Sequence, residues 1–517
     1  MPISFLLDGA PVTVSDQSAT LLDALRDDLG VRAPKDGCSP QGQCGCCTVL
    51  VDGAARVACV TPVRRVAGRA VTTVDGLDPA IRARWADAFC AAGASQCGFC
   101  TPGIVVRLAA LAEPTDAATV ERALLAHLCR CTGWRTILEA AAVAAAPGTP
   151  SPARDLAAAS ARAAIESGGR QQVGPHVALG RAGFADDVAP PGALVAVPDG
   201  RGGWALGETL REARAAAGKV QGRRSTVEER PPIEVPDGPW VRTLQTSWVE
   251  PAYLETDASW CEPGGEPASP LANGGAFGAK LASPAPAAAR RLADETGRCV
   301  RVLLSREDTV RLGPKRPPIA AGVDAQGRIS VRLARSPGAA EAMRRWFAAA
   351  GVFAEVDELD VAGPAVSADL RGAGWAEAAA LAAAARGVAE VVSPAGARAS
   401  AAVGADGSLR VRVACGEPLD EVVLRSYCVG AAHMAASWVT SEALAVSAEG
   451  EVEDLTVRSF GVLRALDTPP IEVEIEPSAA AVVNGGDAVF AAVAAAVWAH
   501  QGFPPVWPTR RPLRASR

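Results

Sequence analysis

Eight of the fourteen cysteines in this 517-residue sequence fall into two groups whose types and spacing could hold metal. The first group has the spacing C-x5-C-x2-C followed by C-x11-C, and its members are Cys38, Cys44, Cys47 and Cys59. Glycines at 37, 42 and 45 let this loop fold closely and present backbone N–H groups to sulfur. The spacing is close to the plant-type C-x4-C-x2-C pattern with a distant fourth thiolate, which holds a [2Fe-2S] cluster. Structural zinc is the alternative, because four thiolates also satisfy one tetrahedral ion.

The second group consists of two close pairs. Cys97 and Cys100 form C-x2-C, and Cys129 and Cys131 form C-x-C, which is tighter than the usual spacing of zinc ligands. Each pair directly precedes a predicted helix start, at Thr101-Pro102 and at Thr132-Gly133. The positive ends of two helix dipoles would then face an anionic cluster. Two clusters in one small unit predict one-electron transfer along a chain of centres, and they leave Cys46 and Cys90 as spare thiols.

The elements that must position these cysteines change along the chain. Alternating apolar residues and an Asp8-Gly9 turn predict a β-rich unit with hairpins over the first 75 residues, and helical periodicity follows from 77 to 145. A stretch rich in Pro, Ala, Ser and Gly predicts a linker, and strands alternate with helices beyond it. The strand-like runs are 300–305, 328–334, 409–414 and 471–476. We therefore expect an α+β chain with units at 1–76, 77–146 and 176–517 and a linker at 147–175.

Charge and hydropathy exclude several classes of protein. The net charge of -6 gives no basic surface for a phosphate backbone, so we expect no nucleic acid. The apolar run from Ala488 to Trp498 is shorter than the roughly 20 residues that cross a bilayer, so we expect no membrane span. No cationic stretch precedes an apolar run at the N-terminus, so we expect no secretory signal and a cytoplasmic location.

Three motifs together resemble the iron-sulfur subunit of the molybdenum hydroxylases, the family of xanthine dehydrogenase, aldehyde oxidase and carbon monoxide dehydrogenase. They are GCSPQGQCGCCTVLVDG (37–53), SQCGFCTPG (95–103) and LCRCTGW (128–134). The resemblance implies a β-grasp [2Fe-2S] ferredoxin domain around the first cysteine group and a four-helix-bundle [2Fe-2S] domain around the second. It also implies that Gln96 contacts the pterin of a molybdopterin cytosine dinucleotide, which carries molybdenum.

The region from 176 onward is similar, less closely, to the molybdenum-binding subunit of that family, a mixed α/β structure. NGGAFGAK (273–280) resembles the glycine loop that approaches the metal and the pterin, and LRGAGWAEA (370–378) resembles the arginine-bearing active-site loop. The cofactor-binding residues that this implies are Gly274, Gly275, Ala276, Phe277, Gly278, Arg371 and Gly372.

Two departures from the family pattern concern catalysis. The region is much shorter than the family's large subunit. The family's G-x-G-E turn, whose glutamate acts as the base, here reads Asn484-Gly485-Gly486-Asp487. Asp487 is the acid in position, although we also expect it to be the N-cap of the last helix. Arg371 and Asp487 are therefore the candidate catalytic residues.

The resemblance implies an oxidoreductase that hydroxylates a small heterocycle or aldehyde with oxygen from water, its electrons leaving through two [2Fe-2S] clusters. Because we find no FAD-binding signature in the sequence, the electron acceptor is expected on a separate chain, as an FAD-binding subunit or another acceptor. The resemblance also allows a second molybdenum-binding subunit as a partner. The alternative is a non-catalytic electron-transfer and assembly subunit whose shortened second half is a partner interface.

Overall fold

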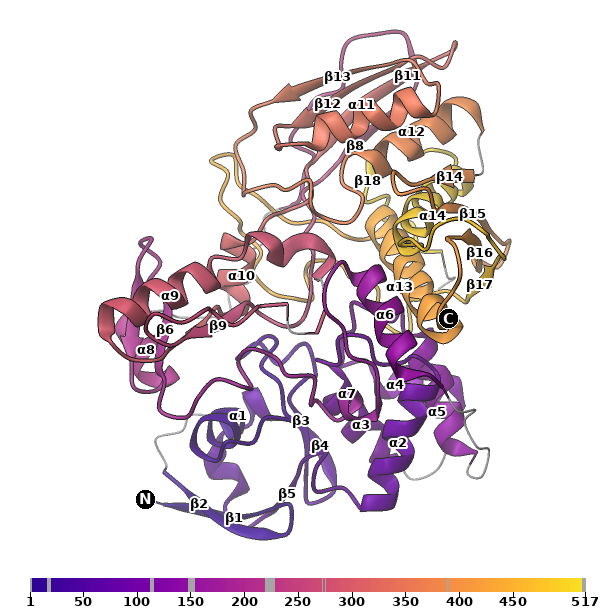
Figure 1. Ribbon diagram of the computed structural model, residues 1–517. Helices are drawn as coiled ribbons and strands as arrows, with labels where there is room; N and C mark the ends of the chain where they lie inside the picture. Colours follow the sequence, from indigo (N-terminus) through magenta and orange to yellow (C-terminus); the bar gives the residue numbers. More distant parts are fainter. Residues whose placement is uncertain are drawn as a thin grey trace.

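The computed structural model describes the chain except residues 1, 16–19, 112–115, 147–153, 219–227, 272, 275, 388–389 and 514–517. It is a mixed α and β structure with four sheets in the described residues. The first unit lies at one end of the molecule, and the later sheets and helices extend away from it (Figure 1). No helix in the described ranges is long and apolar enough to cross a membrane.

The first unit is a five-stranded sheet in the order β2-β1-β5-β3-β4. Its strands are β1 (Ile3–Leu7), β2 (Ala10–Val14), β3 (Thr48–Val51), β4 (Ala54–Val57) and β5 (Ala70–Thr72). β1 and β5 run parallel, and the other neighbours are antiparallel. Both expected hairpins form, and their turns have positive φ at Asp8-Gly9 and Asp52-Gly53. The short helix α1 (Leu21–Asp23) begins with a capping box on Thr20, and its helical turns continue through Asp28.

Four helices follow, as the periodicity predicts: α2 (Pro79–Ala91), α3 (Thr101–Ala109), α4 (Ala117–Ala123) and α5 (Arg135–Ala145). α3 starts at the predicted Thr101, and Asp116 caps α4. The predicted start at Thr132 is wrong, because α5 begins only at Arg135, after Trp134 with a φ of 65°. The Thr132 hydroxyl instead lies 3.1 Å from Cys129 Sγ.

The segment 147–175 is not an unstructured linker in its described part. Residues 147–153 lie outside the described residues, but Leu156–Ser167 form helix α6, which Asp155 caps. Ala159 and Ala163 of α6 pack against Val423 and Tyr427 of α13 (Glu421–Thr440), and the two helices lie side by side (Figure 1). Small alanines allow this close packing, and the lack of large apolar residues is also the reason that the sequence suggested a linker.

The remaining chain forms three sheets with helices packed on them. α7 (Pro175–Ala178) precedes a sheet in the order β7-β6-β10-β9, which α8 (Leu210–Ala217) and α9 (Ala285–Thr296) contact. Its strands are β6 (Leu194–Pro198), β7 (Trp204–Gly207), β9 (Ala258–Cys261) and β10 (Val300–Leu303). The helix α10 (Arg306–Leu312) follows β10 and begins with a capping box on Ser305.

The next sheet has the order β13-β12-β11-β8-β18 and is contacted by α11 (Ala339–Ala349) and α12 (Trp375–Arg386). Its strands are β8 (Trp240–Thr246), β11 (Ile319–Asp324), β12 (Ile329–Ala334), β13 (Ala354–Leu359) and β18 (Val506–Trp507).

The last sheet is β14-β15-β16-β17, formed by Glu390–Val392, Arg398–Val403, Leu409–Ala414 and Ile471–Ile475. The buried helices α13 (Glu421–Thr440) and α14 (Gly486–His500) pack on each other and on this sheet. The four strand-like runs of the second half correspond to β10, β12, β16 and β17, so these strand predictions are confirmed.

Candidate electron-transfer and cofactor site

The first thiol group, Cys38, Cys44, Cys47 and Cys59, is fully buried at the junction of the loop before β3 and the turn after β4. The backbone N–H groups of Gln43 and Cys44 donate to Cys38 Sγ at 3.4 and 3.3 Å. The N–H of Cys59 donates to Cys47 Sγ at 3.4 Å. The hairpin thus brings Cys59 to the loop cysteines, and sulfur atoms that accept backbone hydrogen bonds are typical of cluster ligands.

The spare thiol Cys46 is buried beside the proposed ligands. Cys47 and Cys59 belong to the apolar core of the first sheet, whereas Cys38, Cys44 and the fully buried Cys46 pack with the core of the helical unit. Its Sγ lies 3.8 Å from the carbonyl oxygen of Cys44.

The second group is arranged as two thiol pairs at the ends of the loops before α3 and α5. Cys97 and Cys131 have their Sγ atoms 3.6 Å apart. The Cys100 thiol donates a hydrogen bond to Cys129 and, with the Thr132 hydroxyl, lowers the pKa of Cys129 to about 6. The same hydrogen bond, together with burial, raises the pKa of Cys100. Among the described residues, no group of three or more His, Cys, Asp or Glu side chains is placed to coordinate a single metal ion.

The two thiol groups meet through their loops. The N–H of Leu128, next to Cys129, donates to the carbonyl oxygen of Cys44 at 2.9 Å. Gly45 has a φ of +73°, and a Cβ there would lie 2.5 Å from the ring of His127, so a side chain would push the loops apart. The loops that carry the two thiol groups are therefore in direct contact.

A cavity, which we call the thiol-side cavity, lies between the second thiol group and the loop 273–280. Its walls are Gln96, Cys97, Cys100, Arg130, Cys131, Ser167, Gln171, Tyr253, Leu254, Glu255, Asn273, Gly274, Ala276, Phe277, Lys280 and Tyr427. It encloses about 570 Å³ when its open mouth is counted. The expected pterin contact Gln96 and most of the expected glycine loop thus line one cavity.

Hydrogen bonds join the two walls of this cavity. Gln96 is buried, and its side-chain amide donates to the carbonyl oxygen of Cys131 and to Ser426 Oγ at 3.1 and 3.0 Å. The side-chain amide of Asn273 donates to the carbonyl oxygens of Gln96 and Cys97. These bonds hold the glycine loop against the second thiol group.

The glycine loop itself has an unusual backbone. A Cβ at Gly274 would lie 3.1 Å from Cys97 Cβ, and a Cβ at Gly278 would lie 1.8 Å from the carbonyl oxygen of Asp369. Ala276 and Phe277 have φ of 44° and 56°, a left-handed conformation that is costly for residues other than glycine. Gly275 lies outside the described residues.

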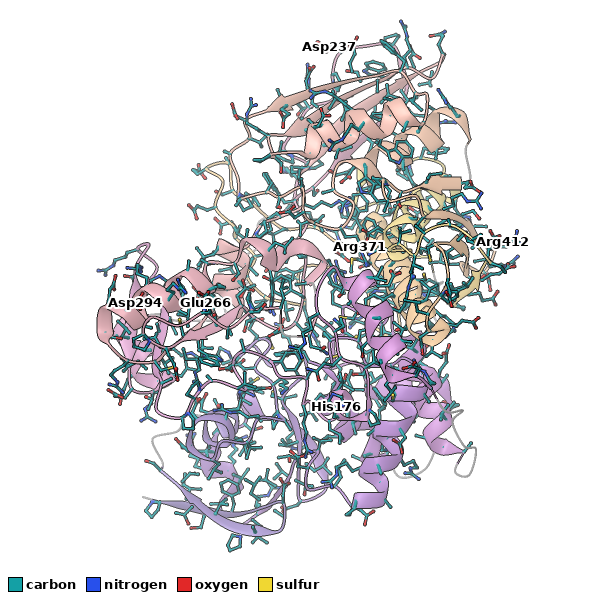
Figure 2. The ribbon with its side chains drawn as sticks, viewed as in Figure 1. His176, Asp237, Glu266, Asp294, Arg371 and Arg412 are labelled. Atoms are coloured by element: carbon teal, nitrogen blue, oxygen red, sulfur yellow. The ribbon has the colours of Figure 1, made fainter. Side chains whose placement is uncertain are left out.

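The two candidate catalytic residues contact each other. The Arg371 guanidinium pairs with Asp487, with 2.9 Å between Nε and Oδ1, and its centre lies 5.0 Å from the centroid of the Phe277 ring. The N–H of Arg371 also donates to the carbonyl oxygen of Phe277, and the neighbouring Gly372 has a φ of +62°. Figure 2 shows Arg371 in the middle of the molecule. The sequence thus predicted two residues that the fold brings together from positions 116 residues apart.

A second, aromatic cavity adjoins the first and shares Phe277 and Arg130 with it. Its walls are Arg130, Val249, Glu250, Pro251, Phe277, Arg316, Leu370, Arg371, Met434, Trp438, Glu442 and Phe490. Trp438 and Phe490 stack with their rings 9° from parallel. Arg371 therefore stands between the glycine loop and an aromatic wall.

Glu166 of α6 is a site residue that the motifs did not indicate. Its carboxylate accepts the N–H groups of Gly485 and Gly486, both at 2.9 Å, and pairs with Arg162 of the same helix. Burial raises the pKa of Glu166.

The expectation that Asp487 is the N-cap of α14 is wrong, because the side-chain oxygen of Asn484 accepts the Asp487 N–H. For Glu166, the only signal in the sequence was its spacing of four residues from Arg162 in a helix, and such charged pairs are common on protein surfaces.

The cavity lining fits a ligand rich in hydrogen-bonding groups. The side-chain oxygens of Gln171 and Tyr427 are buried and make no hydrogen bond within the described residues. Unpaired buried polar atoms are rare and call for an explanation such as a ligand. The two thiol groups suit [2Fe-2S] clusters, and these two oxygens offer hydrogen-bonding groups to a polar ligand of the thiol-side cavity.

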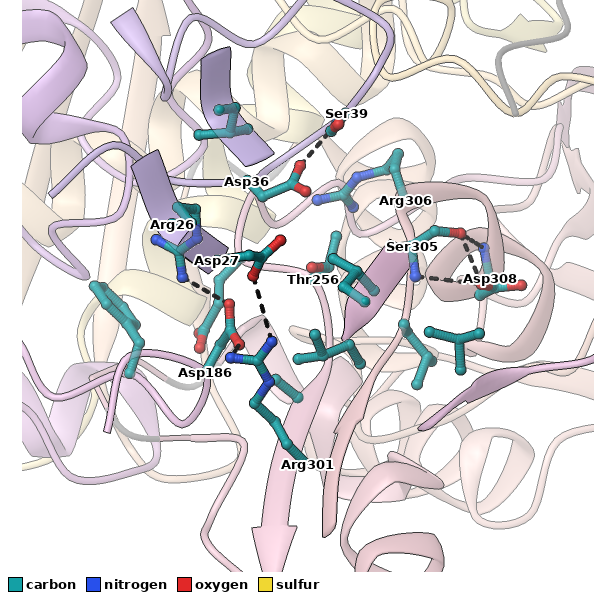
Figure 3. A pocket seen from close by; sticks show the side chains of 18 of the residues that line it. Arg26, Asp27, Asp36, Ser39, Asp186, Thr256, Arg301, Ser305, Arg306 and Asp308 are labelled. Atoms are coloured by element: carbon teal, nitrogen blue, oxygen red, sulfur yellow. Dashed lines mark hydrogen bonds and ion pairs between the residues drawn. The ribbon is translucent and has the colours of Figure 1, made fainter. Parts of the chain in front are cut away.

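Another cavity, drawn in Figure 3, is rich in charge and lies between the first unit and β10. Arg26 pairs with Asp186 at 2.7 Å and with Asp187 at 2.9 Å, and Arg301 faces Asp27 and Asp186. Burial would raise the pKa of Asp186, but Arg26 and Arg301 outweigh burial and lower it to about 2. None of the predicted site residues lines this cavity, and its ion pairs hold the first unit to the second half.

Comparisons with known proteins match part of the chain. Residues 73–142 match the family described as "[2Fe-2S] binding domain". The chain is 40% identical over 141 residues to isoquinoline 1-oxidoreductase subunit alpha of Brevundimonas diminuta, a match that covers 26% of this chain and 91% of that protein. It is 42% identical over 153 residues to xanthine dehydrogenase of Drosophila subobscura, covering 26% of this chain and 11% of that protein.

The fold of the whole chain is similar to a solved structure. The aldehyde oxidoreductase from Desulfovibrio gigas superposes with a TM-score of 0.69 and 14% sequence identity, covering 96% of this chain and 97% of that one. The likeness of fold therefore extends through the second half, where the sequence has diverged.

Proposed function

Because this chain belongs to the molybdenum hydroxylase family, we propose that it is an oxidoreductase that carries two [2Fe-2S] clusters and binds the family's molybdenum cofactor. Its substrate would be a small heterocycle or aldehyde, with oxygen supplied by water. We assign a β-grasp ferredoxin domain to residues 1–76, a helical cluster domain to 77–146, a connecting segment to 147–175 and a cofactor-binding region to 176–517.

The proposal assigns each cluster to four thiols. Cys38, Cys44, Cys47 and Cys59 would hold the ferredoxin-type cluster, and Cys97, Cys100, Cys129 and Cys131 the other. The pairing of Cys97 with Cys131 and of Cys100 with Cys129 gives two thiols to each iron of a two-iron cluster. Electrons would then pass through the loop contact between Leu128 and Cys44.

The molybdenum cofactor would be held in the thiol-side cavity by Gln96 and by the loop residues Gly274, Gly275, Ala276, Phe277 and Gly278, with Arg371 and Gly372 beyond. When bound, it would supply the two-electron oxidation. The single observation that carries the proposal is that this cavity is lined on one side by Cys97, Cys100 and Cys131 and on the other by the glycine loop. A ligand there would contact the wall that holds a redox centre.

The chain's own residues next to the cavity would orient the substrate. The Arg371 guanidinium is placed to donate a hydrogen bond to a ring nitrogen or a carbonyl oxygen of the substrate. The Asp487 carboxylate, paired with Arg371, is the candidate group to accept the proton of the attacking water.

Partners and location follow from the same proposal. The relative in Brevundimonas diminuta is named as one subunit of an oxidoreductase, so we propose that an FAD-binding subunit or another acceptor on a separate chain takes the electrons. A second molybdenum-binding subunit is a further candidate partner. We place the protein in the cytoplasm, where reducing conditions keep cysteine ligands available.

A second candidate function is that of a non-catalytic electron-transfer and assembly subunit. One observation favours it: the backbone N–H groups at the start of α14 are bonded to Glu166, and Arg371 is paired with Asp487. The polar groups at this end of the site therefore already have partners within the chain, as expected of a site that binds no substrate.

The metal content of the full-length protein distinguishes the two functions. Expressed in cells that insert the cofactor, it should contain about four iron and about one molybdenum per chain if it is an enzyme. About four iron without molybdenum would overturn the enzyme and leave the electron-transfer subunit. Zinc in place of iron would overturn both.

A further inference from the structure

We propose that Gln171 and Tyr427 recognise the ligand of the thiol-side cavity, and that ligand binding thereby fastens the connecting segment to the rest of the site. This inference rests on the proposed function, because it takes the ligand to be a pterin. Neither residue belongs to any of the motifs that suggested the site.

The two side chains differ from their neighbours in the cavity wall. Gln171 is 6% exposed and Tyr427 is 4% exposed, and among the described residues of the wall they alone have a fully buried side-chain oxygen without a hydrogen bond. The wall's other tyrosine, Tyr253, donates its hydroxyl to Asp257 at 2.8 Å. A buried polar atom without a partner is destabilising, so a ligand that supplies the partner gains affinity from it.

The chemistry of these two groups defines the ligand atoms that face them. A side-chain amide oxygen only accepts, so it needs an N–H or amino group opposite it. A tyrosine phenol keeps its proton at neutral pH, so Tyr427 donates to a carbonyl oxygen or ring nitrogen. A flat heterocycle with an amino group and an oxo group on one edge, such as a pterin, offers both.

The charges of the wall agree with a neutral ring at this position. Lys280 pairs with Glu255 at 2.8 Å, and Arg130 forms two hydrogen bonds with Glu442. Both cations that line the cavity are therefore already paired with carboxylates from this chain.

Gln171 comes from the segment that follows α6, and this position gives ligand binding a structural consequence. The N–H of the next residue, Gln172, donates to the side-chain oxygen of Asn273 at 2.5 Å, and the N–H of Val173 donates to Ser160 Oγ of α6. A ligand held between Gln171 and Tyr427 would join this segment to α13 across the cavity. It would also lie against the glycine loop, since a Cβ at Gly274 would be 3.1 Å from the Gln171 amide.

The test is a titration of the full-length, cluster-loaded but cofactor-free protein with free pterin, followed by the quenching of pterin fluorescence. Gln171→Leu and Tyr427→Phe should each weaken binding about tenfold, the effect of losing one hydrogen bond. The matched control is Gln172→Leu, which lies outside the cavity wall and should stay within about twofold of wild type. Hydrogen exchange of residues 154–175 should slow with pterin in wild type and not in Gln171→Leu.

Each outcome decides a different claim. Wild-type binding with unchanged affinity in both variants would overturn the inference and leave the proposed function standing. A wild-type protein that binds no pterin would overturn the inference and, if it also contains no molybdenum when expressed with the cofactor, the proposed enzyme as well. Thermal unfolding without ligand checks the folding of the variants: Tyr427→Phe should unfold no earlier than wild type, whereas Tyr253→Phe should unfold earlier. Early unfolding of Tyr427→Phe would show that its hydroxyl has a partner within the chain and would also overturn the inference.

Discussion

At the scale of single residues, we assign three of the four crowded cysteines between 38 and 47 as cluster ligands and the fourth, Cys46, as a spare thiol. Cys38 and Cys47 each accept a hydrogen bond from the backbone of another ligand cysteine of the first group. Cys46 instead lies with its Sγ 3.8 Å from the carbonyl oxygen of Cys44, and it packs, like Cys38 and Cys44, in the helical core. The cysteine spacing, and not burial, therefore singles out Cys46 as the spare thiol.

The first prediction follows from this difference. Cys46→Ala should keep both clusters, with about four iron per chain, because it removes a packed thiol and no ligand. Cys47→Ala should lose the ferredoxin-type cluster and retain about two iron. Iron analysis and visible absorbance of the two purified variants measure this directly. If the two results were exchanged, the assignment of ligands in the first group would be wrong.

At the scale of elements, the structure gives α6 a larger role than its composition suggests. The helix pairs Arg162 with Glu166 in a fully buried position and places the Glu166 carboxylate at the N-terminus of α14. A carboxylate at a helix N-terminus is stabilised both by the free N–H groups and by the helix dipole. This contact ties the segment after the cluster domains to the turn that holds Asp487.

The second prediction tests that contact. Glu166→Gln should lower the free energy of unfolding of the second half by about 3 kcal/mol, because it leaves Arg162 buried beside an uncharged amide. Glu341→Gln is the matched control: Glu341 is 57% exposed and lies 3.8 Å from Arg345 on the same helix, so the change should stay below about 0.5 kcal/mol. Urea unfolding followed by tryptophan fluorescence measures both. Equal effects of the two substitutions would show that the Glu166 contact is not structural.

The elements that the sequence predicted are those with local signals. The turn at Asp8-Gly9 and the start of α3 at Thr101-Pro102 are set by residues next to each other in the chain. α6 was missed because its buried face is built from alanines, whose packing depends on α13, more than 250 residues away. In the site, the cysteine spacing and the family motifs indicated the thiols, Gln96 and Arg371. Gln171 and Tyr427 could not be predicted, because only the tertiary fold brings them to one cavity.

At the scale of the whole molecule, the cluster unit and the second half form one connected structure. Arg130, between two of the proposed cluster ligands, forms two hydrogen bonds with Glu442 just after α13. Arg154 pairs with Asp420, just before α13, and Arg26 pairs with Asp186 and Asp187. Both ends of α13 are thus tied by ion pairs to residues that precede the second half. This arrangement keeps the thiol-side cavity next to the second thiol group.

The central claim is that the two thiol groups hold two separate [2Fe-2S] clusters, and electron paramagnetic resonance of the dithionite-reduced, full-length protein tests it most directly. We predict two distinguishable signals that together integrate to about two unpaired spins per chain. Cys100→Ala should abolish one signal and retain the other, because it removes a ligand from the helical group alone. A single signal in the wild-type protein, or the loss of both signals in Cys100→Ala, would contradict the claim.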